Sequence, residues 1–119
     1  QVTLMGLLLD PIQHRVEFSS AGHEYAYLYR RSSRQIEVIG TGTERGMAMG
    51  WDPTQTYEQI QLSLEKGDCL LALTDGVKDA RDSKDRRFEA HLLPTLQAYA
   101  TRSKRVTAEG LAQDLVNLV

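Results

Sequence analysis

Short runs of alternating or continuous apolar residues fill the first two-thirds of this chain and predict β-strands. Residues 14–19 and 35–39 alternate polar and apolar side chains, which is typical of a half-buried strand. Residues 2–9 form a mostly apolar run that closes on the turn signal Asp10-Pro11. Residues 24–30 are rich in aromatic side chains, which favour pleated surfaces. We expect these four segments to form a meander of antiparallel strands.

Two further strands are predicted after a glycine-bearing loop at residues 40–53. The spacing of its glycines matches neither a dinucleotide fingerprint nor a phosphate-binding P-loop, so we interpret the loop as a structural crossover. Residues 57–64 then alternate with period two, and the apolar run 69–74 follows the turn Lys66-Gly67-Asp68. We expect the last two segments to form a second hairpin, with its second strand buried.

The last third of the chain has helical spacing. Apolar residues recur every three or four positions over 88–100, where Pro94 predicts either a kink or a break into two short helices. A second helix is expected after Thr107, which we predict as its N-cap, up to about residue 118. Strands over about 2–74 followed by helices over about 88–118 predict one α+β domain at 1–119, with helices packed against an antiparallel sheet.

Composition excludes some classes of function. The chain has 119 residues, 25% of them charged, and a net charge of -2, so it has no overall basic field that would attract nucleic acid. We interpret the clusters Arg30-Arg31 with Arg34, and Asp85-Arg86-Arg87, as solvated loops. No window has the apolar length of a transmembrane helix. We therefore expect neither a nucleic acid nor a membrane as a partner.

A single cysteine and a few histidines give little sign of catalysis. With only Cys69, no disulfide can form within the chain, which fits a reducing compartment and predicts a cytoplasmic protein. We expect Cys69 to be a small core residue, because a nucleophile needs an electropositive, exposed setting. His23, at the start of a strand, is either a structural hydrogen-bonding residue or a ligand or acid-base group. No residue is identified as catalytic.

The segment 70–81 carries the strongest chemical signal. An apolar run ends in Thr74-Asp75-Gly76 and then becomes polar. A carboxylate fixed at the end of a rigid strand suits a hard divalent cation such as Mg²⁺, which requires oxygen ligands in a strict geometry. Asp75-Gly76 is also a common turn signal. A metal-binding carboxylate and a simple turn are both consistent with these residues alone.

An ordered set of motifs resembles a known family. Ser20-Ala21-Gly22-His23 comes first, the glycine-bearing loop runs through Met49-Gly50, and Glu65-Lys66-Gly67-Asp68 precedes the run 70–81. The order and spacing of these motifs resemble the metal-dependent serine/threonine protein phosphatases across most of the chain. The resemblance is closest to the bacterial branch named after sporulation stage II protein E (SpoIIE-like).

The resemblance implies a fold, a reaction and roles for five residues. The family fold is an antiparallel β-sandwich with flanking helices, in which two Mn²⁺ or Mg²⁺ ions share a bridging water that attacks the phosphoryl group. Asp75 matches a metal ligand of the family, and Gly76 would let the chain turn sharply behind the metal. Asp79 matches an acidic position of the bacterial branch, while Gly22 and His23 are candidates for residues near the site.

The resemblance also implies partners in bacterial signalling. The substrate would be a phosphorylated protein, for example one of the anti-anti-sigma type, in a pathway that regulates a sigma factor. A second hypothesis is a phosphatase-like binding module that has lost its metals and only docks a partner. The family carries further aspartate motifs that bind its metals, described below, and their presence in the source gene would favour the enzyme.

The chain departs from the family at most of the expected metal ligands. The upstream Gly-Asp-x-x-Asp-type and Asp-Gly motifs have no match, nor does the downstream Asp-Asp-x-Thr-type strand, so Asp75 is the one matched ligand. Because several ligands must converge on each ion, we expect these 119 residues alone to be inactive or nearly so. We also expect an incomplete sandwich with bare strand edges, and hence a homodimer or an intertwined oligomer at high concentration.

Overall fold

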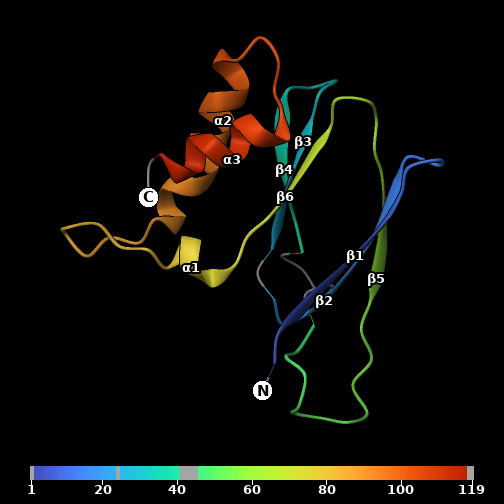
Figure 1. The fold of residues 1–119 in the computed structure, drawn as a ribbon. Coiled ribbons are helices and arrows are strands. Elements are labelled where there is room, and N and C mark those ends of the chain that lie inside the picture. The colour runs from blue at the N-terminus through green and yellow to red at the C-terminus, as the bar shows by residue number, and fades with distance from the viewer. Residues whose placement is uncertain (1, 24, 41–45, 118–119) are drawn as a thin grey trace. The chain divides into compact units, whose positions relative to one another are not determined.

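The computed structural model describes residues 2–23, 25–40 and 46–117, and in this part of the chain it has two small antiparallel sheets and three helices (Figure 1). The α+β class is therefore confirmed. The chain folds into two compact units. The sheet unit comprises Gln1–Tyr25 and Ile39–Glu65, and the helical unit comprises Ala26–Val38 and Lys66–Val119. The prediction of a single domain over 1–119 stays a prediction.

The sheet unit is built around a central strand. Strands β1 (Leu4–Asp10), β2 (Arg15–Ala21) and β5 (Gln59–Ser63) lie in the order β1-β2-β5. The alternation predicted for β2 is confirmed, because Val16 and Phe18 are each only 1% exposed while their neighbours are half-buried. The first step of the predicted meander, the antiparallel pairing of β1 with β2, is also confirmed by its register.

Strand β1 presents apolar side chains at the edge of this sheet. Leu4, Leu8 and Leu9 are 54%, 65% and 62% exposed. An edge strand leaves one row of backbone groups without a partner strand, so an apolar edge favours pairing with another chain. The turn that follows β1 is fixed by Asp10, whose Oδ1 accepts hydrogen bonds from the backbone N–H groups of Ile12 and Gln13 at 3.0 Å each.

The helical unit holds the second sheet. Strands β3 (Ala26–Arg30), β4 (Gln35–Ile39) and β6 (Cys69–Ala72) lie in the order β4-β3-β6. The central strand β3 is buried along almost its whole length, with both Ala26 and Leu28 at 0% exposure. The predicted start of this strand at residue 24 lies outside the described residues.

Helices α2 (Glu89–Arg102) and α3 (Ala108–Val116) pack against one another and beside this sheet (Figure 1). Helix α2 is tied to β4 through Gln97, whose Oε1 accepts from the backbone N–H of Ile36 at 3.3 Å and whose Nε2 donates to the carbonyl of Arg34 at 3.1 Å. Helix α2 continues through Pro94, so the break into two short helices is excluded. Pro94 itself is exposed.

The predicted N-cap at Thr107 is confirmed. Its Oγ1 accepts a hydrogen bond from the backbone N–H of Gly110 at 3.0 Å, and Leu111 and Leu115 on the following turns are buried. Residue 118, the predicted end of this helix, lies outside the described residues, and α3 ends at Val116.

The predicted strand pairings are wrong in two places. The meander does not continue from β2 to β3, and β5 and β6 do not form a hairpin. Strand β5 instead pairs with β2, and β6 pairs with β3, each in antiparallel register. The link between β5 and β6 therefore passes from the first sheet to the second. At its start, the backbone N–H of Leu64 donates to the carbonyl of His14, beside β2. At its end, Asp68 accepts hydrogen bonds from Arg30 and Arg31, at the end of β3.

Strand β6 is also less buried than its apolar sequence predicts. Cys69, Leu70 and Leu71 are half-buried and Ala72 is exposed. The reason is its position at the edge of the sheet, where one side of the strand has no neighbouring strand. Of the predicted crossover loop at 40–53, residues 41–45 lie outside the described part of the chain.

The cap of α3 can be tested by comparing a threonine-to-alanine substitution at the cap with the same substitution inside α2. Thr107→Ala removes the side-chain acceptor that caps this helix start and should lower the free energy of unfolding by about 1 kcal/mol. Thr101→Ala, inside α2, removes a bond to the carbonyl of Gln97 that competes with the helix, so it should be neutral or stabilising by a few tenths of a kcal/mol. Urea unfolding measures both, and equal losses would contradict the capping role.

Gly22 provides a second test, in the sheet unit. Its φ is +65°, and a Cβ built on it would lie 2.6 Å from the backbone N of Ala48. Gly22→Ala should therefore lower the free energy of unfolding by about 1–3 kcal/mol. In the control, Gly6→Ala, the nearest atom would be 3.9 Å away and the effect should stay within about 0.5 kcal/mol. Unfolding followed by circular dichroism compares them, and a neutral Gly22→Ala would contradict the close approach.

Candidate functional site

Asp75 lies where the second sheet gives way to a one-turn helix. Strand β6 ends at Ala72, and α1 (Asp75–Lys78) begins three residues later with Asp75 as its first residue. The side chain of Asp75 is exposed. The backbone N–H of Asp79 donates to the carbonyl of Asp75 at 2.8 Å, which closes the turn. Residues four apart on a helical turn lie on the same face, so the two carboxylates are neighbours on an exposed surface.

Asp79 interacts with the loop that follows α1. Its Oδ1 lies 3.7 Å from Nη2 of Arg87, and both side chains are about half exposed, at 55% and 53%. Ion pairs of this exposure contribute little to stability. Asp79 therefore remains available to solvent, beside Asp75 and not buried beneath it.

Gly76 is not needed for the turn. We expected it to permit a sharp change of direction, but the chain turns by starting α1, in which Gly76 has no positive φ. A Cβ built on it would make only an ordinary contact, 3.7 Å from Oγ1 of Thr74. This expectation is therefore wrong, because helical backbone is accessible to any residue.

Lys78 is the residue of this segment that the sequence analysis missed. It is only 2% exposed, and it has an interaction partner, as a lysine buried to this degree almost always does. It is the last residue of the single turn of α1, and it is buried although Asp75, three residues earlier, is exposed. No apolar periodicity distinguishes one turn of helix, so only the fold reveals this burial.

Gly22 and His23 belong to the sheet unit. Gly22 bridges to Leu4 and lies against the backbone of Ala48, as described above. His23 follows it and is half-buried, with a partner of its own. Asp75, Gly76 and Asp79 are therefore brought together in the helical unit, while Gly22 and His23 form a separate pair in the other unit.

The residues described do not by themselves form a two-ion metal centre. Over residues 2–23, 25–40 and 46–117, no group of three or more His, Cys, Asp or Glu side chains is arranged to hold a metal ion. Mg²⁺ and Mn²⁺ are held by several oxygen atoms that converge on one point. Asp75, even with Asp79 one turn away, supplies too few of these, so we derive no reaction step through a metal from this geometry.

Cys69 does not have the setting of a nucleophile. Burial raises the pKa of its thiol, and the nearby charge of Asp68 raises that pKa further. Since the thiolate is the reactive form, Cys69 is a poor nucleophile at neutral pH. The expectation that it is a core residue is also wrong, because it is half-buried and lines a cavity.

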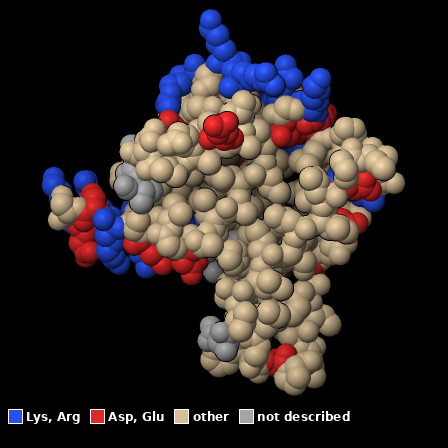
Figure 2. Space-filling view, viewed as in Figure 1, with Lys and Arg blue, Asp and Glu red and all other residues tan. Residues whose placement is uncertain are grey.

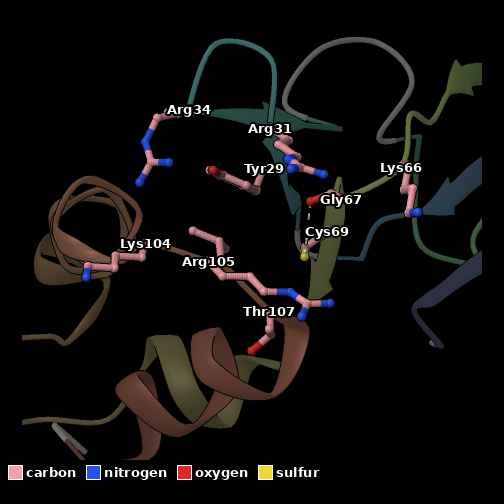
Figure 3. Close-up of a pocket in the computed structure, with 10 residues that line it drawn as sticks. Tyr29, Arg31, Arg34, Lys66, Gly67, Cys69, Lys104, Arg105 and Thr107 are labelled. Atoms are coloured by element: carbon pink, nitrogen blue, oxygen red, sulfur yellow. Dashed lines mark hydrogen bonds between the residues drawn. The ribbon is translucent and has the colours of Figure 1, made fainter.

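The cavity beside Cys69 is lined by basic side chains and has a volume of about 490 Å³. We call it the basic cavity. Figure 3 shows basic side chains from three segments around it, with Tyr29 and Cys69 between them. Figure 2 shows Lys and Arg gathered at the top of the view, over the ends of β3, β4 and α2. Its basic residues are Arg31, Arg34, Lys66, Lys104 and Arg105.

The solvated-loop interpretation is therefore incomplete for the first arginine cluster. Arg30 pairs with Asp68 at 3.0 Å and with Glu37 at 3.4 Å, and Arg34 donates to the carbonyl of Ala100 at 2.8 Å. The second cluster agrees with the interpretation, since Arg86 is 61% exposed and pairs with Asp82 in its own loop. In the described part of the chain, no helix is long and apolar enough to cross a membrane.

Comparison with known proteins places these features in a family. The family model described as stage II sporulation protein E (SpoIIE) matches residues 1–119. Phosphoserine phosphatase RsbU of Bacillus subtilis is 23% identical over 106 residues, which cover 89% of this chain and 31% of that protein. Protein IcfG of Synechocystis sp. is 29% identical over 97 residues, which cover 81% of this chain and 15% of that protein.

These matches extend over nearly the whole chain but over less than a third of either relative. The family model covers every residue, including the Thr74-Asp75-Gly76 segment and the Gly22-His23 pair. The resemblance seen in the ordered motifs is thus confirmed, and the chain belongs to the SpoIIE family.

Proposed function

We propose that this chain is part of a metal-dependent phosphoserine/phosphothreonine protein phosphatase. The observation that carries the proposal is the exposed carboxylate of Asp75 at the junction of β6 and α1, in a chain whose whole length matches the SpoIIE family. The name of the relative RsbU, a phosphoserine phosphatase, supports the same reaction class.

In this proposal Asp75 contributes one ligand to a site for Mn²⁺ or Mg²⁺. Its position favours the role, because a carboxylate at the start of a single helical turn is accessible from solvent and fixed at its backbone. Asp79, Gly76, Gly22 and His23 are proposed as neighbours of the site. The described residues contain no group of three or more candidate ligands, so the remaining ligands are left unassigned. The hydrolysis by a metal-activated water belongs to the proposal without an assigned geometry.

The wider context is proposed from the same resemblance. The two sheets would pack as an antiparallel sandwich within one domain, and the protein would act in the cytoplasm. Its substrate would be a phosphorylated signalling protein, for example one of the anti-anti-sigma type in sigma factor regulation. The exposed leucines of β1 support self-association, since apolar edge strands pair readily.

The decisive test uses the natural full-length protein that carries this sequence. Asp75→Asn should lower the Mn²⁺-dependent hydrolysis of a phosphoserine peptide by at least about 100-fold, because a metal ion supplies several kcal/mol of transition-state stabilisation. Asp79→Asn should lower it by about 10-fold if it orients a ligand. The matched control is Asp85→Asn, in an exposed loop with the side chain 83% exposed, and it should stay within a factor of two.

Binding of Mn²⁺, measured by electron paramagnetic resonance, gives a second reading on the same variants. Weaker binding in Asp75→Asn with unchanged binding in Asp85→Asn supports the ligand role. Full activity in Asp75→Asn would contradict it. A natural protein that neither binds Mn²⁺ nor hydrolyses the peptide would instead favour the non-catalytic binding module.

A further inference from the structure

We propose that the basic cavity of the helical unit binds a compact polyanion that carries two or more phosphoryl groups. This site is distinct from the one proposed at Asp75. It rests on the way three chain segments are fixed around the cavity and on a lining that includes no acidic residue among those the structure describes.

The turn after β3 and the residues before β6, the first two segments, are joined by the buried carboxylate of Asp68. Asp68 is 1% exposed at its side chain, and it accepts hydrogen bonds from Nη1 of Arg30 at 3.0 Å and from the backbone N–H of Arg31 at 2.9 Å. These bonds hold the turn after β3 against the residues that precede β6. Gly67, with φ +94°, lies directly against the side chain of Arg31, because a Cβ at this position would collide with the Cδ of that arginine.

The third segment, which links α2 to α3, is joined to the first by Arg34. Its Nη2 donates to the carbonyls of Ala100 and Ser103, the last of which lies just beyond the end of α2. The residues after Ser103 then lead to the N-cap Thr107, which also lines the cavity. All three segments are therefore held by specific bonds, so the cavity is part of the fold and not an accident of loose surface chains.

The charge of the lining is unbalanced. Five of the chain's 14 Lys and Arg residues line this cavity, whereas none of the Asp or Glu residues that the structure describes does. Asp68 is occupied beneath the surface by Arg30 and Arg31. Across the described part of the chain, the side chains of Arg31, Lys66 and Arg105 have no acidic group within 4.0 Å. A hollow lined by one sign of charge concentrates ions of the opposite sign.

The shape of the site indicates the kind of anion. A volume of about 490 Å³ falls in the range of small-molecule pockets, whereas nucleic acids and membranes are met by extended surfaces. Arginine forms paired hydrogen bonds with phosphoryl oxygens, and several cations favour a ligand with several charges. Tyr29 is only 2% exposed, so its ring offers no face for stacking a base. The phosphoryl groups, and not a nucleobase, are therefore the recognised part.

The cavity is far along the sheet from Asp75. Cys69, the first residue of β6, lines the cavity, and Asp75 follows six residues later, which is up to about 20 Å of extended chain. A polyanion in the cavity would thus not occupy the proposed metal site. It would act as a bound effector or a docking group, and not as the group that reacts.

The test is isothermal titration calorimetry of the protein with sodium pyrophosphate, tripolyphosphate and orthophosphate, at low salt and in the presence of EDTA. EDTA removes divalent metals, so the result does not depend on the proposed phosphatase function. We expect one site per chain, with pyrophosphate and tripolyphosphate bound at least about tenfold more tightly than orthophosphate.

Matched variants locate the site. Arg31→Ala and Arg105→Ala should each weaken pyrophosphate binding by about tenfold or more, as expected for the loss of a charge-assisted hydrogen bond. Arg86→Ala removes the same charge from a loop that does not line the cavity, and it should leave binding within about a factor of two. Circular dichroism confirms that each variant is folded.

Three results would overturn the proposal. These are no binding of pyrophosphate by the unaltered protein, an equal affinity for orthophosphate, and a loss in Arg86→Ala as large as that in Arg31→Ala. The last result would mean that net charge, and not this cavity, attracts the anion.

Discussion

The buried carboxylate of Asp68 is the interaction on which the helical unit depends. It joins the end of β3 to the start of β6 through Arg30 and the backbone of Arg31, with its side chain only 1% exposed. A buried carboxylate without these donors would be energetically costly. The donors are in reach only when β6 begins at this position. The register of β6 beside β3 follows from this anchor, and with it the position of everything at either end of the strand.

The two ends of β6 carry opposite charges and different chemistry. At its start, the segments tied by Asp68 and Arg34 surround the basic cavity. At its far end, the chain turns into α1 and exposes Asp75, with Asp79 one turn away. One short strand thus separates a site suited to anions from a carboxylate suited to a cation. The two proposals can therefore be tested independently, although both rest on the same strand.

Local features of the sequence predicted the structure better than long-range ones. The hairpin of β1 and β2 and the cap at Thr107 were predictable because nearby residues determine them. The β5–β6 hairpin was predicted wrongly because Lys66-Gly67-Asp68 resembles a simple turn. Asp68 in fact bonds to Arg30, 38 residues earlier in the chain, and each strand finds its partner in a different sheet. The burial of β6 was overestimated for a related reason, because composition does not reveal which strand forms the edge.

The candidate sites also differ in whether local sequence reveals them. Asp75 could be found from its motif alone, whereas the basic cavity could not, because its cations come from three segments far apart in sequence.

Anomalous X-ray diffraction from crystals of the natural full-length protein soaked in Mn²⁺ tests the central claim, that Asp75 is a metal ligand, most directly. The account predicts an anomalous peak at bonding distance, on the order of 2 Å, from a carboxylate oxygen of Asp75. Mn²⁺ peaks in the protein with none beside Asp75 would contradict it.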